Sequence, residues 1–419
     1  MTQSIAPNHT IGLNDAEIRS ERKALRKRRQ QALLLVLPLL AFIFFSFVAP
    51  ITTMLYRSIY NPSVAHLIQH TSSTLNHWDG QSSPPPEALQ AMALDLHELA
   101  QNRQAGTFAA AVNRHFSGAT SIINRSARAL RSENENTVHV SGAQILTNTH
   151  PQWSDPTFWR AIREAGRAYS ETNFLTALDL ERNESGAIQA RSSARIYIQL
   201  YAKTLYIAAA ITLLCILLGY PLAYYMAHTS NNRANILLIF VLLPFWTSLL
   251  VRTTAWIALL QTNGVINSFL IWTGFISTPL EMLYTRFSTI IAMTHILLPF
   301  MVLPLYSVMR GIDGSYVRAA LSMGSRPLGA FFKVYLPLSL PGLSAGTLLV
   351  FIISVGYYIT PALVGGTDGQ LISNLIAFHM QQSSNWGLAA ALGALLLAVI
   401  LLLYWVYDRL VGASNIRLG

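Results

Sequence analysis

Residues 315–343 read SYVRAALSMGSRPLGAFFKVYLPLSLPGL and separate two long apolar runs. Their pattern predicts two short helices with a glycine between them. Asp313 or Ser315 is suited to cap the first helix and Ser325 the second, because a short side-chain oxygen accepts hydrogen bonds from the first free N–H groups of a helix. Gly324 stands where a helix commonly ends in a left-handed residue. A folded, cationic loop between two membrane spans is expected to contact another molecule.

Within this stretch, a spacing pattern is formed by two alanines, three residues, a glycine, nine residues, an aliphatic residue, any residue, and Leu-Pro. Its positions are Ala319, Ala320, Gly324, Val334, Leu336 and Pro337. The pattern resembles the coupling-helix motif, or EAA loop, of the membrane subunits of ABC importers. The resemblance implies contact with a separate ATPase. One position departs from the family pattern, because Arg318 stands where the family has glutamate.

The chain beyond Gly324 is expected to form a second short helix that Leu336-Pro337 ends, with the next span beginning near Pro341. Phe331, Phe332 and Lys333 on that helix have two interpretations. They supply apolar and charged contacts to a partner, or they pack against the membrane surface.

The composition indicates a membrane protein. The chain has 419 residues, of which 52% are hydrophobic and 11% are charged. Several runs exceed about 18 nearly uncharged residues, the length that crosses roughly 30 Å of hydrocarbon as a helix. The one cysteine, Cys215, lies in an apolar run, which excludes an intramolecular disulfide and a metal site built from several thiols.

The net charge of +10 reflects membrane topology rather than nucleic-acid binding. Seven basic residues stand directly before the first apolar run, the positive-inside signature of a cytoplasmic N-terminus; they are Arg19, Arg22, Lys23, Arg26, Lys27, Arg28 and Arg29. No RNA- or DNA-binding module follows, so nucleic acid is not an expected partner. The first run, 32–56, is too long for a signal-peptide core and is expected to remain as an anchor in the lipid bilayer.

We predict an all-α polytopic fold with six transmembrane helices. They cover about 32–56, 203–228, 235–260, 287–308, 341–363 and 387–407. A segment that begins at Gly264 is too short to cross and is expected to be interfacial or re-entrant. A cytoplasmic N-terminus then places the C-terminus, where Arg409 and Arg417 lie, in the cytoplasm as well.

This topology divides the chain into five parts. They are a basic cytoplasmic segment (1–31), the first span (32–56), a periplasmic insertion (57–199), a five-helix permease core with a cytoplasmic coupling loop at 309–340 (200–410), and a cytoplasmic tail (411–419). The insertion is charged and rich in Ser and Asn, and it shows helical periodicity in 87–103 and after Asp155. At about 140 residues it is long enough to bury a core of its own. We predict a mostly helical domain.

A second resemblance covers nearly all of residues 195–410. It rests on TLYIAAAITLLCILLGYPLAYYMA, LLPFWTSLLVRTTAWIALL, LLPFMVLPLYSVM and SVGYYITPALVGG. These segments look like the spermidine/putrescine-type branch of type I, binding-protein-dependent ABC importers in the bacterial inner membrane. The resemblance implies a second, similar permease subunit, an ATPase dimer and a periplasmic solute-binding protein as partners. The insertion departs from the pattern, because the first external loop of that branch is much shorter.

An energy source is not found in this chain. A phosphate-binding loop needs a lysine after glycine, and none of Lys23, Lys27, Lys203 and Lys333 follows one. ATP is therefore expected to be hydrolysed on a separate polypeptide, and no cofactor or metal is expected on this one. The pair His66 and His70 has the spacing of a metal site, but solvated histidines are the favoured interpretation because no third ligand lies nearby in sequence.

Candidate pathway residues lie in two places, around Arg252 and around Tyr357. Buried charge in a membrane usually faces a cavity or a partner, although Arg252 also lies near enough to a span end to reach the interface. The proposed set is Trp246, Thr247, Arg252, Trp256, Tyr357, Tyr358 and Thr360. For the tryptophans, interfacial anchoring is the alternative. Tyr357, Tyr358, Thr360 and Pro361 are expected to interrupt the fifth span, which suits a translocation path; the alternative is simple helix termination before Gly365-Gly366. His295 is interpreted as a packed histidine rather than a proton relay.

A small polar solute, most simply a polyamine, is the expected substrate. Polyamines favour acidic and aromatic groups, but the acids after residue 200 are Glu281, Asp313, Asp368 and Asp408, and none lies mid-span. Selectivity is therefore expected to reside mainly in the delivering protein.

Three other classes of protein are alternatives to an importer subunit. A membrane-anchored sensor using 57–199 would need an output module, for which the tail after Asp408 leaves no room. A proton-coupled transporter would favour mid-membrane carboxylates and repeats. An integral membrane enzyme would need a catalytic or metal constellation. The importer subunit is the interpretation that the residues favour.

Overall fold

The structure is a computed structural model that describes residues 15–60, 62–75, 78–183, 187–191, 195–383 and 385–411. The predicted segments 1–14 and 412–419 lie outside the described residues. The chain forms two compact units, and the first ends at Tyr56. In it, helix α1 (Asp15–Ile43) continues through a π-helical turn, η1 (Phe44–Val48), into α2 (Ala49–Ile59). The apolar side chains of 33–48 in this unit are mostly exposed, as lipid contact requires.

The second unit, Arg57–Gly419, contains the other apolar helices. They are α11 (Tyr197–His228), α12 (Asn231–Trp246), α13 (Leu249–Leu260), α14 (Val265–Trp272), α15 (Arg286–Arg310), α18 (Leu336–Gly356), α19 (Ile359–Val364), α20 (Ile372–Gln381) and α21 (Trp386–Val411). Counting Arg29–Ile59, the described residues contain five helices long and apolar enough to cross a membrane, or six with the broken pair α12–α13/α14. The predicted all-α polytopic fold is confirmed.

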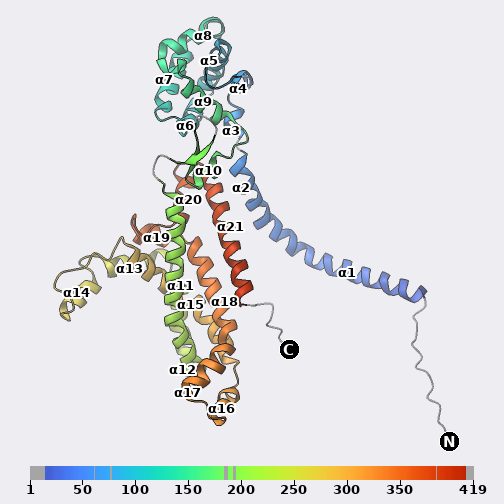
Figure 1. Ribbon diagram of the computed structural model, residues 1–419, viewed down its shortest axis with the longest axis vertical. Helices are drawn as coiled ribbons and strands as arrows, with labels where there is room; N and C mark the ends of the chain where they lie inside the picture. The colour runs from blue at the N-terminus through green and yellow to red at the C-terminus, as the bar shows by residue number, and fades with distance from the viewer. Residues whose placement is uncertain are drawn as a thin grey trace. The chain divides into compact units, whose positions relative to one another are not determined.

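Small residues let three of the spans pack closely. Helices α11, α15 and α18 lie side by side (Figure 1). A Cβ atom at Gly219 would lie 2.9 Å from Met301, and one at Gly346 would lie equally close to the same side chain. Lipid offers no hydrophobic drive for helices to associate, so this close backbone approach supplies the packing contacts.

Two of the predicted spans are broken; the break in the third span was not predicted, whereas the interruption of the fifth span at Tyr357 was. The predicted span 235–260 is two helices, because α12 ends at Trp246 and α13 starts after Ser248; the pair from Asn231 to Trp272 bends by 99°. The predicted span 341–363 is likewise α18 followed by α19, with extended backbone at Tyr357. Pro244 lies in the last turn of α12, where its missing N–H disturbs the helix.

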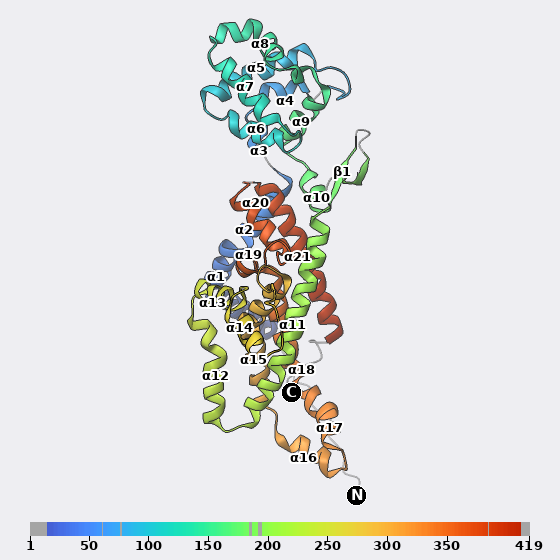
Figure 2. The ribbon, with the colours of Figure 1, turned by 90° about the vertical axis from the view of Figure 1, so that its left-hand side faces the viewer.

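Most of the insertion is a separate bundle of short helices (Figure 2). They are α3 (Pro62–Ala65), α4 (Gln69–Leu75), α5 (Pro86–Gln101), α6 (Ala105–Asn113), α7 (Ala119–Arg131), α8 (Glu135–Thr149), η2 (Pro151–Ser154) and α9 (Pro156–Gly166). Their shared core runs from Val64 to Ile162 and contains Trp153 and Trp159, both fully buried. Burial of two such large side chains explains why the bundle holds without disulfides.

The bundle has an interior polar contact that its sequence did not reveal. The buried carboxylate of Asp95 accepts hydrogen bonds from the Thr71 N–H at 2.8 Å and hydroxyl at 2.7 Å, and it lies 2.7 Å from Nδ1 of His70. His70 is 67% exposed, as the interpretation of a solvated histidine expects, but it also has an acidic partner, Asp95, which lies 25 residues away in sequence. Within the described residues no group of three His, Cys, Asp or Glu side chains is placed to hold a metal.

The chain enters and leaves the bundle at adjoining positions. Tyr60 and Tyr169 form an antiparallel bridge, and their rings lie 4.8 Å apart. The N–H of Ser170 also donates to the carbonyl of Ile59 at 2.9 Å. The two chain segments that lead into and out of residues 61–168 therefore lie next to each other. An inserted domain whose ends adjoin in this way is easy to remove.

The last part of the insertion packs with the membrane helices instead. Helix α10 (Thr172–Ala177) shares a core with α11 and α21, and strands β1 (Leu180–Arg182) and β2 (Ile188–Ala190) form a small antiparallel hairpin. The buried carboxylate of Asp179 accepts hydrogen bonds from the N–H groups of Tyr197 and Ile198. Asp179 therefore caps the start of α11, as a negative charge at a helix N-terminus does. The predicted bounds 57–199 remain a prediction.

We expect that replacing residues 61–168 with a short Gly-Ser linker leaves the membrane helices folded, because Tyr60 and Tyr169 already adjoin. The measurement is size exclusion and thermal unfolding in detergent, with a melting temperature within a few degrees of the intact chain. A longer deletion, 61–183, is the matched control; it removes Asp179 and α10 and should be clearly less stable. Aggregation of the shorter deletion would contradict the assignment of 61–168 as a removable module.

Candidate coupling loop and translocation pathway

The predicted coupling loop follows α15 and contains two short helices, as expected. Helix α16 is Gly314–Ser322 and α17 is Pro327–Ala330. Gly324 lies between them with φ of +86°, in the left-handed region that favours glycine. Asp313 is the cap, because its carboxylate accepts the N–H of Ser315 at 2.8 Å.

The charge of Asp313 strengthens this cap. The hydrogen bond from the Ser315 backbone, with a smaller contribution from the nearby Arg318 charge, lowers the pKa of Asp313 below 3.8. The cap therefore contributes fully above the ordinary pKa and is lost as pH falls through the lowered value. At neutral pH the loop begins with a charged cap. The prediction that Ser325 caps the second helix is wrong, because Arg326 holds that position without a side-chain cap bond.

Arg318 lies two residues deeper in the helix than a cap at Ser315 would place it. With Asp313 as cap, it is the fifth helical residue, too far along for the capping-box role of a third-position glutamate. Its guanidinium folds back, since a Cβ on Gly314 would lie 3.1 Å from Arg318 Nη1. Arg318 and Ala319 are exposed, whereas Ala320 is buried.

The predicted stop at Leu336-Pro337 is wrong. The chain passes from α17 through a π-helical turn, η3 (Phe331–Tyr335), directly into α18. A proline inside a helix loses one hydrogen bond and collides with the carbonyl four residues earlier. The wider π-turn shifts the bonding register just before Pro337, so the helix continues. Val334, Leu336 and Pro337 therefore join the loop to a span without a hinge.

An aromatic cluster fastens this π-turn to another span. It consists of Tyr220, Tyr224 and His228 on α11 with Phe331 and Tyr335 on η3. Phe331 and Tyr335 stack at 5.9 Å, and Tyr224 meets Tyr335 edge-on at 5.1 Å. The Tyr220 hydroxyl lies 2.9 Å from that of Ser339. Movement of the loop therefore reaches both α18 and α11.

The first group of pathway candidates gathers at the break between α12 and α13. Arg252 donates from Nη2 to the carbonyls of Pro244 and Thr247, the latter at 2.9 Å. Ser248 caps α13 through the N–H of Val251. Arg252 thus serves carbonyls that the break leaves without helix partners, and this role accounts for an arginine in a span.

Trp256 and Trp246 differ in their surroundings. Trp256 donates from Nε1 to Nδ1 of His295 on α15 at 3.3 Å, so these two residues from separate spans come together. Trp246 is 74% exposed and is not brought into this group. His295 is exposed, but its ring is hydrogen-bonded to Trp256 within the helix bundle, which agrees with its interpretation as a packed histidine.

The second group lies at the break between α18 and α19. Ser373 Oγ donates to the carbonyl of Tyr357 and Asn374 Nδ2 to that of Tyr358, each at 2.7 Å. Thr360 is buried, and its hydroxyl has no hydrogen-bond partner among the described atoms. Helix α19 packs against α13, so the segments that follow the two breaks are in contact. Sequence reasoning missed Ser373 and Asn374, whose only signal is their position after a glycine-rich turn.

The chain is similar in sequence to known transport proteins. A family model described as "Binding-protein-dependent transport system inner membrane component" matches residues 216–413. The spermidine/putrescine transport system permease protein PotB of Escherichia coli (strain K12) is 35% identical over 218 residues, 51% of this chain and 79% of PotB. The chain belongs to this permease family. It is therefore a multi-pass inner-membrane permease of the ABC importer type.

Two further similarities were found. The inner membrane ABC transporter permease protein YdcU of the same organism is 33% identical over 230 residues, 51% of this chain and 71% of YdcU. The chain also resembles a crystal structure of a bacterial alginate ABC transporter in complex with alginate pentasaccharide-bound periplasmic protein. The similarity covers 52% of this chain and 78% of that chain, with 18% sequence identity and a TM-score of 0.42. The family model begins within α11, so it leaves out the insertion.

We expect Phe331→Ala to destabilise the folded chain by about 2 kcal/mol, less than the roughly 3–5 kcal/mol of a fully buried phenylalanine because its ring is only partly buried. The melting temperature in detergent is the readout. Phe332→Ala is the matched control, since that neighbouring ring is 59% exposed. Equal effects of the two changes would argue against the aromatic cluster as a stabilising contact.

Proposed function

We propose that this chain couples a separate ATPase to solute import through the loop at 309–340. The observation that carries the proposal is a set of exposed apolar side chains on the loop. Met323 is 82% exposed, Leu328 73% and Phe332 59%. Apolar side chains gathered on a polar loop favour burial against a protein partner. Exposed Arg318, Arg326 and Lys333 surround them and suit an acidic rim on that partner.

The loop is built to move as one piece with the spans. Helix α17 continues into α18 through η3, and the aromatic cluster ties η3 to α11. Rigid elements of this kind transmit a partner's closure as a shift of packed helices. Ala319 and Gly324 supply the small, tightly turned surface, buried Ala320 packs beneath it, and Val334, Leu336 and Pro337 carry the movement onward.

The partners in this proposal are an ATPase dimer, a second permease subunit and a periplasmic solute-binding protein. The family to which the chain belongs supports them, because its description names transport that depends on a binding protein. ATP is hydrolysed on the partner, and this chain binds no cofactor of its own. Both termini lie in the cytoplasm, consistent with the basic residues at 19–29 and with the coupling loop on the same side.

A polyamine-like cation is the proposed substrate. Support comes from the name of PotB, a spermidine/putrescine permease protein, and from the pathway candidates themselves. Trp256, Tyr357 and Tyr358 offer aromatic faces that attract ammonium groups without binding them tightly. Arg252 donates to backbone carbonyls and, as a cation without an acceptor, does not itself attract a polyamine. Weak contacts of this kind fit a pathway that releases its cargo, with selection left to the binding protein.

Affinity purification of the chain from mild detergent tests the partner assignment. We expect a phosphate-binding-loop ATPase and a second multi-span protein to co-purify. Leu328→Asp should remove the ATPase while keeping the second permease, because only the loop contact acquires a charge. Val140→Asp, on an 86% exposed side chain of the insertion, is the matched control and should keep both. Retention of the ATPase by Leu328→Asp would contradict docking at this surface.

We expect Gly324→Val to lower ATP-driven uptake of labelled putrescine or spermidine roughly tenfold. A Cβ there meets nothing within 4 Å, so the cost is the positive φ alone, about 1–3 kcal/mol for a non-glycine residue. Gly324→Asn is the control, because asparagine tolerates this conformation and should transport within about twofold of the unchanged chain. Normal uptake by the valine variant would sink the coupling assignment.

A further inference from the structure

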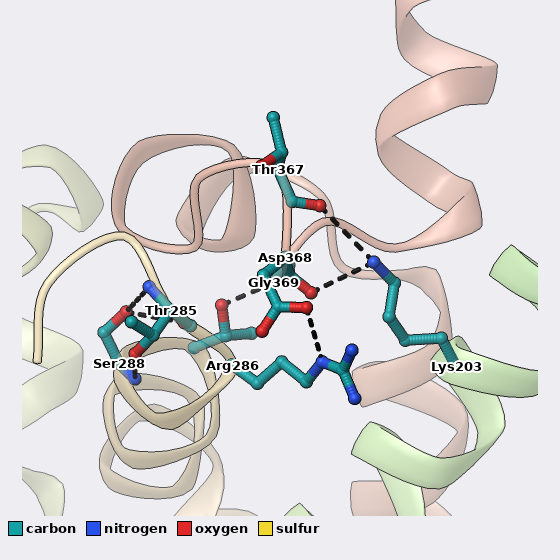
Figure 3. Close-up of polar contacts among 8 residues, drawn as sticks. Lys203, Thr285, Arg286, Ser288, Thr367, Asp368 and Gly369 are labelled. Atoms are coloured by element: carbon teal, nitrogen blue, oxygen red, sulfur yellow. Dashed lines mark hydrogen bonds and ion pairs between the residues drawn. The ribbon is translucent and has the colours of Figure 1, made fainter.

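The turn between α19 and α20, residues 365–371, is held by side chains from two spans. Lys203 on α11 donates from Nζ to the carbonyl of Asp368 at 3.0 Å and to that of Thr367 at 3.4 Å. Figure 3 shows these carbonyls pointing toward the lysine. We call residues 365–371 the glycine turn. The carbonyls of Thr367 and Asp368 thus face α11 and accept hydrogen bonds from Lys203.

Helix α15 holds the other side of the glycine turn. Arg286 donates from Nε to Oδ1 of Asp368 at 2.7 Å, and the Thr289 hydroxyl donates to the Gly369 carbonyl at 3.2 Å. Ser288 also donates to the carbonyl of Val364 at 2.7 Å in a buried position. Asp368 therefore joins two spans, since its carboxylate meets α15 and its carbonyl meets α11 (Figure 3).

The shape of the turn is fixed by glycine. A Cβ at Gly365 or at Gly369 would lie 2.4 Å from Thr289 Oγ1, a distance that real side chains do not adopt. Gly366 has φ of +55°, and a Cβ there would lie 2.6 Å from the Tyr284 carbonyl oxygen. The glycine turn therefore packs tightly against α15. A movement of α15 or α11 would displace it, because side chains of both helices are hydrogen-bonded to it.

The charged contacts differ from the buried ones in their exposure. Arg286 and Asp368 are 52% and 49% exposed, so water can replace either partner when the ion pair opens. Exposed ion pairs shift an equilibrium by roughly two- to fivefold only. Such a contact is too weak to hold the fold but strong enough to bias two arrangements of it.

The position of the turn decides the position of α19. This short helix carries buried Thr360 and packs on α13 and α15. It ends at Val364, whose carbonyl accepts the hydrogen bond from Ser288 of α15. The Arg286 end of α15 is opposite the Arg310 end that enters the coupling loop. The turn therefore lies at the end of the pathway far from the ATPase contact.

We propose that Lys203, Arg286 and Asp368 are positioning residues that form a latch, which keeps α19 closed over the outer end of the pathway. The latch releases when α11 and α15 separate at that end; α15 leads into the coupling loop at its Arg310 end, and the aromatic cluster joins the loop to α11. The inference rests on the proposed function for its link to ATP. The latch itself is a property of α19 and is measured without ATP below.

The first test uses the complete complex in lipid nanodiscs. Opening the latch by Asp368→Asn or Arg286→Gln should raise ATP hydrolysis in the absence of binding protein about two- to fivefold, because the closed arrangement loses its bias. The charge swap Arg286→Asp with Asp368→Arg should return hydrolysis toward the original level. Glu171→Gln is the matched control, since it breaks the Arg182–Glu171 pair of similar exposure away from the turn.

The second test reports the position of α19 directly. In a Cys215→Ala background, Thr360→Cys places one thiol at a fully buried position. A membrane-impermeant maleimide added outside should label it about two- to fivefold faster when Asp368→Asn is present, and not faster with Glu171→Gln.

The two readouts separate the proposals. Faster labelling without any change in hydrolysis would support the latch and count against the ATP coupling. Labelling that does not change in Asp368→Asn, or a charge swap as open as the single variants, would overturn the latch.

Discussion

The main constraint on this fold is that every backbone carbonyl freed inside a membrane must find a donor. A helix satisfies its own backbone, so each break in a span costs several unpaired groups. This chain has two breaks, after Trp246 and after Gly356. At the first, Arg252 supplies the donors. At the second, Ser373 and Asn374 do so from α20. The side chains near the breaks are thus explained first by backbone satisfaction.

The same constraint applies to the segments that follow the breaks. Helix α19 packs against α13, so these two segments are in contact. Irregular backbone at membrane depth is tolerated beside protein or a water-filled cavity. A region built in this way can change its arrangement by exchanging hydrogen-bond donors, without unfolding a helix.

The sequence was sufficient for the elements with strong periodicity and for the loop motif. The long apolar runs predicted the spanning helices, and the alanine–glycine spacing predicted α16, the left-handed Gly324 and α17. Such features are local, since length and a single φ decide them. The continuation through Pro337 was not predictable, because it depends on a π-turn held by Tyr224 from another span. The contact of His70 with Asp95 was missed for the same reason, since 25 residues separate them.

The insertion shows how such a core accepts a large addition. A module whose ends adjoin at Tyr60 and Tyr169 imposes little strain on the segments that carry it. The short stretch that follows must still begin α11 correctly, and there Asp179 meets the free N–H groups. Helix α11 also carries Lys203 and part of the aromatic cluster, so its starting point is linked to both sets of contacts. The bundle is attached through adjoining ends, whereas the residues that join it to α11 pack with the membrane helices.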